Sequence, residues 1–232
     1  MLSGGYMGYM IIAGLMSFIG MMVSGRLKSK FAHYSKIPNS SGMSGYDVAN
    51  AMLSGYGITD VKVVEGQGML SDHYNPMNKT IALSPEVYRG RSVASAAVAA
   101  HECGHAVQHA ESYAMLKVRS GLVPIVKVSS MAQQWILMLA LGGFGAGMSG
   151  SNTIIMIAIA VFGVTALFSF ITLPVEFDAS KRALVWLDGA NITQGAEYDG
   201  AKDALQWAAM TYVASALSAL VMLLYLVSRL RN

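Results

Sequence analysis

The chain has 232 residues, of which 54% are hydrophobic and 12% charged, and its formal net charge is +3. Its mean hydropathy of +0.46 excludes an ordinary soluble domain and requires apolar segments that cross a membrane. The single cysteine excludes an internal disulfide. The one basic run, at 26–36, adjoins an apolar segment, so we expect no nucleic-acid partner.

Four apolar stretches are long enough to cross a bilayer. Those at 6–23, 153–173 and 204–227 carry no charge. The stretch at 122–144 is ambiguous, because its first half holds Lys127 and several other polar residues. We interpret it as a span whose polar half lies at the interface or faces the protein interior. The sequence therefore predicts a mostly α, polytopic membrane protein with four transmembrane helices.

The basic residues predict the orientation of the chain in the membrane. Arg26, Lys28, Lys30 and Lys36 follow the first apolar stretch, and no charge precedes it. Because positive residues favour the cytoplasmic side, we expect both termini outside and the segment after the first span inside. Residues 142–150, which are small and rich in glycine, then form a tight extracellular loop.

Between the first two spans, the pattern predicts a small cytoplasmic α+β domain. Ser44 and Asp47 have the spacing of a capping box, which predicts a short helix to about residue 54. Residues 58–65 and 79–83 are predicted strands, and Pro85 begins another helix.

The motif His-Glu-x-x-His occurs at His101, Glu102 and His105. Residues 92–100 just before it are strong helix formers with Ser92 as a cap, so both histidines share one helix face and can bind a single Zn²⁺. Glu102 lies beside that ion, where it can take a proton from water. The alternative is a buried helix with two structural histidines, which would cost desolvation for no evident return.

A catalytic zinc with two histidines and one water needs a third protein ligand. Four residues are candidates: His109, Glu111, Asp188 and Glu176. The Cα of His109 lies about 12 Å from that of His101 on a straight helix, and Glu111 lacks the preceding glycine turn of metzincins. Asp188 resembles the Leu-Asp-Gly element of site-2 proteases, but lies in a charged segment. We favour Glu176, whose simpler interpretation is a carboxylate that pairs with a nearby basic residue.

The third ligand also bears on topology. Glu176 must lie on the same side of the membrane as His105, so an even number of spans separates them. The stretch at 122–144 must then cross the membrane together with that at 153–173.

Four blocks of sequence, at 70–76, 83–88, 101–108 and 174–180, resemble the bacterial YugP-type membrane zinc metallopeptidases. The resemblance implies a neutral, gluzincin-like zinc peptidase with one Zn²⁺ per chain. The segment around Glu176 also resembles the third-ligand segment of HtpX-type and CAAX prenyl proteases. Those relatives usually carry an aspartate four residues after the ligand glutamate, where this chain has Ser180. Its own aspartate, Asp178, is offset by about 200° from Glu176 on a helix.

The expected chemistry is metal-assisted peptide hydrolysis, with Glu102 as the general base and acid. By analogy with zincins, we expect the strand at 79–83 to hold an extended peptide by edge pairing. A further donor must stabilise the oxyanion. Of the candidates His73, Tyr74, Tyr113 and Arg182, we rank His73 and Tyr113 first; a simple polar turn explains His73 equally well.

The sequence thus predicts five consecutive regions: a first transmembrane helix (1–25), a cytoplasmic catalytic region (26–121), a transmembrane hairpin (122–173), a cytoplasmic segment with the third ligand (174–203) and a last transmembrane helix (204–232). The predicted function is a zinc endopeptidase that cleaves membrane or unfolded proteins at the cytoplasmic face. Its partners are polypeptide substrates and the bilayer, and the sequence is compatible with an oligomer or an accessory membrane partner. The alternatives are a non-catalytic zinc-binding membrane protein and a site-2-type intramembrane protease that uses Asp188.

Overall fold

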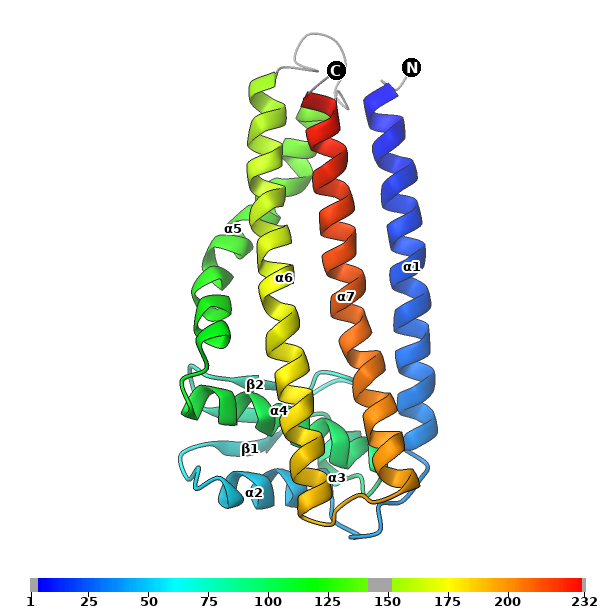
Figure 1. Ribbon diagram of the computed structural model, residues 1–232, viewed down its shortest axis with the longest axis vertical. Helices are drawn as coiled ribbons and strands as arrows, with labels where there is room; N and C mark the ends of the chain where they lie inside the picture. Colours follow the sequence, from blue (N-terminus) through cyan, green and yellow to red (C-terminus); the bar gives the residue numbers. More distant parts are fainter. Residues whose placement is uncertain (1–3, 142–151, 231–232) are drawn as a thin grey trace. The chain divides into compact units, whose positions relative to one another are not determined.

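The computed structural model describes residues 4–141 and 152–230 (Figure 1). The predicted loop at 142–150 lies outside these residues. The described elements, in chain order, are α1 (Gly4–Tyr34), α2 (Gly45–Gly55), β1 (Lys62–Glu65), β2 (His73–Asn75), β3 (Thr80–Leu83), α3 (Pro85–Arg89), α4 (Val93–Ala110), α5 (Ala114–Leu141), α6 (Asn152–Gly189) and α7 (Ala196–Leu230). The chain is mostly helical with a small sheet, which confirms that part of the predicted fold class.

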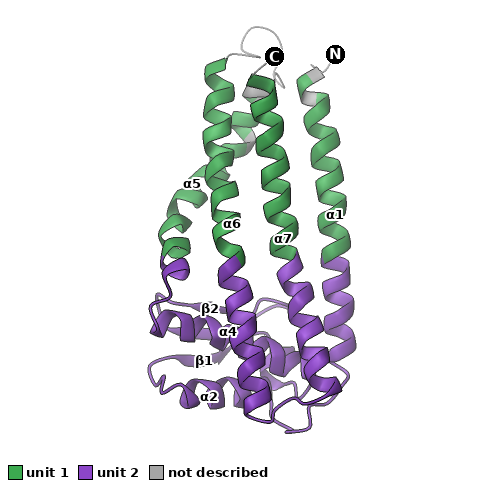
Figure 2. Cartoon of the chain, in the orientation of Figure 1, with its two compact units in different colours: residues 1–23, 118–173, 211–232 green, residues 24–117, 174–210 purple. Residues whose placement is uncertain are grey.

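The chain divides into two compact units, coloured in Figure 2. Unit 1 comprises residues 1–23, 118–173 and 211–232, and unit 2 comprises residues 24–117 and 174–210. Helices α1, α5, α6 and α7 each contribute residues to both units.

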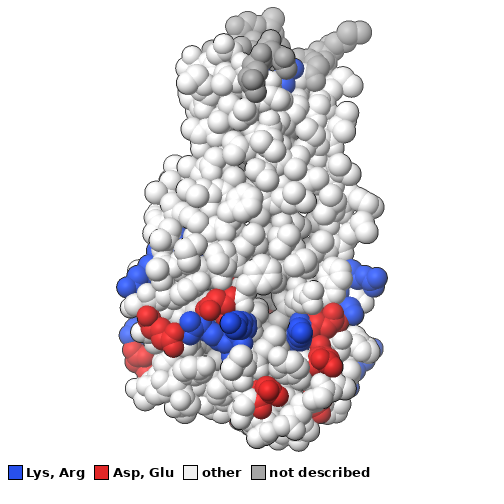
Figure 3. Space-filling model, viewed as in Figure 1, with Lys and Arg blue, Asp and Glu red and all other residues white. Residues whose placement is uncertain are grey.

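Unit 1 is built for an apolar environment. All 13 acidic residues of the chain belong to unit 2, and none belongs to unit 1. Many large apolar side chains of unit 1 are exposed, among them Phe18, Met21, Met131 and Trp135. In the face shown in Figure 3, the acidic side chains and most of the basic ones lie over unit 2.

Three helices are long and apolar enough to cross a membrane: Met7–Tyr34 within α1, α6 and α7. They correspond to three of the four predicted spans. Helix α5 is not among them, so its crossing remains a prediction. Within unit 1, α5, α6 and α7 share a buried cluster that includes Leu137, Phe162 and Leu226.

Unit 2 contains a three-stranded sheet in the order β1-β3-β2. Strand β3 is parallel to β1 and antiparallel to β2, with Ile81 opposite both Val63 and Tyr74. The expectation that the strand at 79–83 pairs with an extended peptide is therefore wrong, because β3 already has a strand bonded to each edge. The outer strands of this sheet are β1 and β2.

The capping box at the start of α2 is confirmed. The Ser44 Oγ accepts a hydrogen bond from the Asp47 N–H at 3.2 Å, and the Asp47 carboxylate accepts one from the Ser44 N–H at 2.9 Å. This exchange satisfies two backbone donors that would otherwise lack helical partners. It fixes where α2 begins, and α2 packs closely against α4.

Helix α4 forms the centre of unit 2. Ser92 caps it by accepting a hydrogen bond from the Ser95 N–H, as the sequence predicts. Its alanines are almost all fully buried and pack in one core with the α2 residues Val48 and Met52 and the β3 residue Ile81. Because alanine is small and a strong helix former, α4 can be regular and buried on most of its surface.

Candidate metal centre

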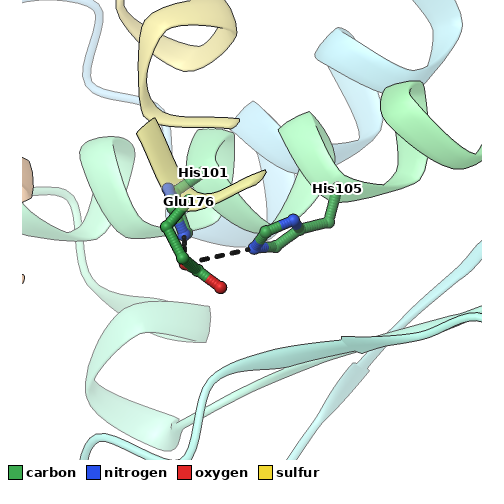
Figure 4. A group of neighbouring side chains, drawn as sticks. All are labelled: His101, His105 and Glu176. Atoms are coloured by element: carbon green, nitrogen blue, oxygen red, sulfur yellow. Dashed lines mark ion pairs between the residues drawn. The ribbon is translucent and has the colours of Figure 1, made fainter. Parts of the chain in front are cut away.

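Two histidines on α4 and a glutamate on α6 lie close together in unit 2 (Figure 4). The Nε2 atoms of His101 and His105 lie 3.3 Å and 3.6 Å from the Glu176 Oε2. One ligand atom of each residue lies within 4.8 Å of the others. All three side chains are largely or fully buried, and Glu176 is the most deeply buried of them. Two imidazole nitrogens thus converge on one carboxylate.

The geometry of this group fits a zinc ion. Ligands bound tetrahedrally at about 2.0–2.1 Å lie about 3.3 Å from one another, close to the two nitrogen–oxygen distances observed. Two imidazoles and a carboxylate are also a donor set of catalytic zinc sites, in which the fourth position takes water or substrate. A simple ion pair would need only one histidine next to the carboxylate.

The glycine between the two histidines explains how α6 comes so near. A Cβ on Gly104 would lie 2.6 Å from the Ala179 carbonyl oxygen. Only a residue without a side chain lets the backbone of α6 approach α4 this closely. The approach brings Glu176, less than one helical turn before Ala179, within reach of the histidines.

The second ring nitrogen of each histidine also has a partner. The His101 Nδ1 lies 3.1 Å from the Ser180 Oγ, and the His105 Nδ1 lies 3.0 Å from the Gln108 Oε1. Gln108 donates hydrogen bonds of 2.8 Å to the Val175 carbonyl oxygen and to the Asp178 Oδ2. Such partners orient metal-binding imidazoles and are important for their affinity.

Sequence analysis missed Gln108. Its only signal was a position three residues after His105, on a neighbouring part of the same helix face. Asp178, which is offset by about 200° from Glu176 on a helix, reaches His105 through the Gln108 amide.

Arg182 continues this chain of contacts. Its Nε donates to the Asp178 Oδ2 at 2.5 Å, and its Nη1 donates to the Glu111 Oε2 at 2.6 Å. Two carboxylates therefore hold the Arg182 guanidinium. Arg182 is one of the lower-ranked candidates for the donor that stabilises the oxyanion. Glu111, a candidate third ligand, is bound to Arg182 and is not in the group of Figure 4.

The other two candidate ligands also lie apart from this group. The His109 Nδ1 lies 2.7 Å from the Tyr74 hydroxyl, so each of these residues has the other as a partner. Asp188 is exposed and lies about 18 Å from Glu176 along α6. Among the described residues, His101, His105 and Glu176 form the one group of His, Cys, Asp or Glu side chains that is close enough to hold a metal ion.

Glu102 follows the first histidine and is only 7% exposed. No hydrogen bond or ion pair joins its carboxylate to another residue of the described chain. Its charge nevertheless acts on His105. Burial opposes the charged form of His105, but its hydrogen bond with Glu176 and the charges of Glu102 and Glu176 outweigh burial and raise the pKa of the imidazole.

His73 and Tyr113 are the two preferred oxyanion candidates. In the described part of the chain, no hydrogen bond or ring contact joins either of them to His101, His105 or Glu176. His73 lies on β2 and is exposed, with its Nδ1 2.8 Å from the Ser71 carbonyl oxygen. Tyr113 is half-buried just after α4, and its N–H donates to the Gln108 carbonyl oxygen.

Asp72, next to His73, has a structural contact. Its carboxylate accepts hydrogen bonds from the N–H and hydroxyl groups of Ser84, at the start of α3. Burial raises the pKa of Asp72, although these hydrogen bonds oppose the shift.

Comparison with known proteins identifies the family. The family described as "Putative neutral zinc metallopeptidase" matches residues 9–231. The chain belongs to this family. It is also 41% identical over 199 residues to a Bacillus subtilis protein described as "Putative membrane protease YugP", and the alignment covers 86% of each chain. No solved structure matches the chain. The resemblance inferred from the sequence motifs is thus confirmed.

Proposed function

We propose that this member of the zinc metallopeptidase family is an endopeptidase whose single zinc is held by His101, His105 and Glu176. It hydrolyses peptide bonds of membrane or unfolded proteins at the cytoplasmic face of the bacterial plasma membrane. The observation that carries the proposal is the convergence of two imidazole Nε2 atoms on the Glu176 carboxylate. The family match supports the choice of zinc and of peptide hydrolysis.

A zinc ion held by these three residues would supply the Lewis acidity that polarises the scissile carbonyl and activates water. Glu102 takes the proton of the attacking water and delivers it to the leaving amine. Its surroundings suit this role, because the carboxylate is nearly buried and has no partner among the described residues that would compete with water.

The oxyanion needs a donor from the protein as well. Arg182 is held by Asp178 and Glu111, and Tyr74 is bonded to His109. These contacts favour His73 and Tyr113 for this role, although each would have to move toward the substrate. An extended substrate would pair with β2, an outer strand of the sheet that packs against α4.

Membrane topology forms the second part of the proposal: α5 is the fourth span. Its exposed apolar residues Val118, Ile125, Val128 and Trp135 recur at helical spacing, as on a stripe that faces lipid. The basic residues at 26–36 favour the cytoplasm for unit 2.

The decisive experiment compares the purified wild type with Glu102→Gln. This variant keeps the three zinc ligands, so we expect about one zinc per chain in both proteins. Cleavage of an unfolded or membrane-protein substrate should fall by about 10² to 10⁴ in the variant, the usual contribution of a general acid–base group. His109→Ala serves as a control and should retain both zinc and cleavage.

Three outcomes separate the alternatives. Wild-type turnover by Glu102→Gln would exclude this mechanism. A wild type that binds zinc but cleaves no substrate would indicate a non-catalytic zinc protein. A wild type that binds no zinc would exclude both the zinc peptidase and the non-catalytic zinc protein.

A further inference from the structure

Gln108 is fully buried between α4 and α6, and the orientation of its side-chain amide is fixed by its surroundings. The amide nitrogen lies 2.8 Å from two oxygens, the Val175 carbonyl and the Asp178 carboxylate. The Val175 carbonyl can only accept a hydrogen bond, and the Asp178 Oδ2 already accepts one from the Arg182 Nε. If the amide were rotated, its oxygen would face the Val175 and Asp178 oxygens, which it cannot bond. The amide nitrogen must therefore face these two oxygens, and the amide oxygen must face His105.

We infer that Gln108 is a positioning residue that selects the metal-binding tautomer of His105. Its Oε1, 3.0 Å from the His105 Nδ1, can only accept. The proton of a neutral His105 imidazole must then sit on Nδ1, which leaves the lone pair on Nε2. That is the atom that lies 3.6 Å from the Glu176 Oε2 in the candidate metal centre.

The other histidine lacks this restriction. The partner of the His101 Nδ1 is the Ser180 hydroxyl, which can donate or accept a hydrogen bond. Ser180 therefore permits either tautomer of His101, whereas Gln108 permits one tautomer of His105. We expect the two histidines to differ in how strongly their surroundings prepare them for a metal.

Gln108 also joins the two helices that carry the ligands. Its bond to the Val175 carbonyl reaches the residue immediately before Glu176. Its bond to Asp178 continues through Arg182 to Glu111. One side chain thus orients a ligand on α4 and holds the segment of α6 that presents the third ligand.

The first test measures zinc affinity by competition with a chelator, and it rests on the proposed zinc site. Gln108→Met has a similar volume but neither donor nor acceptor, and we expect its affinity to fall by about 10- to 100-fold. The zinc affinity of Ser180→Ala should fall less than that of Gln108→Met. Gln194→Met, at an exposed position of unit 2, is the control for the substitution itself, and its zinc affinity should match that of the wild type. A wild-type zinc affinity in Gln108→Met would contradict the inference.

Gln108→Glu tests the same idea with a polar side chain, should Gln108→Met not fold. Its second oxygen would face the Val175 carbonyl and the Asp178 carboxylate, so zinc affinity should fall. Wild-type zinc affinity in Gln108→Glu would contradict the proposed bonding.

The second test needs neither zinc nor activity. ¹⁵N NMR of histidine side chains reports the tautomer directly, and Glu176→Ala removes the carboxylate that competes for the Nε2 proton. In this metal-free background the neutral His105 should carry its proton on Nδ1. Adding Gln108→Met should shift it to Nε2, the form that a free imidazole prefers.

An unchanged tautomer in the double variant would overturn the inference, whatever the zinc affinities are. A wild type that binds no zinc would overturn the proposed function but leave this second test decisive for Gln108.

Discussion

Glu176 and Asp188 are both carboxylates on α6, and only their positions distinguish them. Glu176 is buried, with Oε2 near both imidazoles, whereas Asp188 is exposed about three turns further along the helix. Burial of a carboxylate is costly unless positive charge or strong donors compensate it. A zinc ion between Glu176 and the histidines would supply that compensation.

We therefore expect Glu176→Ala to lose most of its zinc, and Asp188→Ala to retain it. Metal analysis of the purified proteins measures the zinc content, and gel filtration checks that both variants fold. Loss of zinc in Asp188→Ala together with retention in Glu176→Ala would reverse the assignment and favour the site-2-type mechanism.

Asp72 gives a prediction about pH. Its pKa is raised in the folded chain, mainly by burial, so the folded state binds the proton more tightly than the unfolded state does. The neutral form is thus favoured by folding, and stability is lost as the pH rises from the unfolded pKa through the folded one. Asp72→Asn keeps the size and remains neutral at every pH.

The melting temperature of the wild type, relative to Asp72→Asn, should consequently fall as the pH is raised from about 4 toward 7. Thermal unfolding in detergent across this range measures the difference. A relative melting temperature that rises with pH would mean that the bonds from Ser84 stabilise the charged form more than burial disfavours it.

At this scale, the sequence predicted the residues that make up the candidate metal centre but not those that orient them. His101, Glu102 and His105 form a local motif, and Glu176 could be selected among few charged residues. Gln108 could not be recognised, because its role depends on how close α6 comes to α4. Ser180 and Asp178 were noted as departures from related proteases, and the structure gives each a contact: Ser180 with His101, and Asp178 with Gln108.

At the scale of elements, the contact between α4 and α6 determines the candidate metal centre, and Gly104 determines that contact. A methyl group there would lie 2.6 Å from the Ala179 carbonyl oxygen, a backbone atom that cannot rotate away. The helices would have to separate, and Glu176 would move away from the histidines.

We expect Gly104→Ala to lower the free energy of unfolding by about 1–3 kcal/mol, the usual cost of overpacking, and to weaken zinc binding. Gly25→Ala is the matched control, because nothing lies within 4 Å of its Cβ position on α1. That variant should be neutral or slightly stabilising, since alanine favours a helix. Chemical unfolding and chelator competition measure the two effects; wild-type zinc affinity in Gly104→Ala would show that the close approach is dispensable.

The helices were more predictable than the sheet. Hydropathy, the Ser44 capping box and the Ser92 cap are local signals, and the structure has helices where they indicated. Strand β2 was missed because it has three residues next to an Asn-Pro turn. The central place of β3 depends on pairing between distant segments, which no local pattern encodes.

At the scale of the whole molecule, the two units combine segments that are far apart in the sequence. Residues 24–117 and 174–210 pack in one unit. In the sequence they are separated by residues 118–173, which include most of α5 and the apolar part of α6. If α6 crosses the membrane and α5 does not, the two parts of unit 2 would fall on opposite sides. Because the two segments pack in one unit, they must lie on the same side of the membrane, so an even number of helices must cross the membrane between them. This supports α5 as a transmembrane helix.

Accessibility of single cysteines in intact cells tests this topology. Cys103 is buried and is replaced by alanine to remove the native thiol. We expect a membrane-impermeant thiol reagent to leave Gln67→Cys and Gln194→Cys unlabelled and to react with Met148→Cys; after lysis all three should react. Gln67 and Gln194 are exposed positions in the two separate segments of unit 2, so their behaviour should be the same. Labelling of both in intact cells would place the candidate metal centre outside the cytoplasm, and labelling of only one would mean that α5 does not cross.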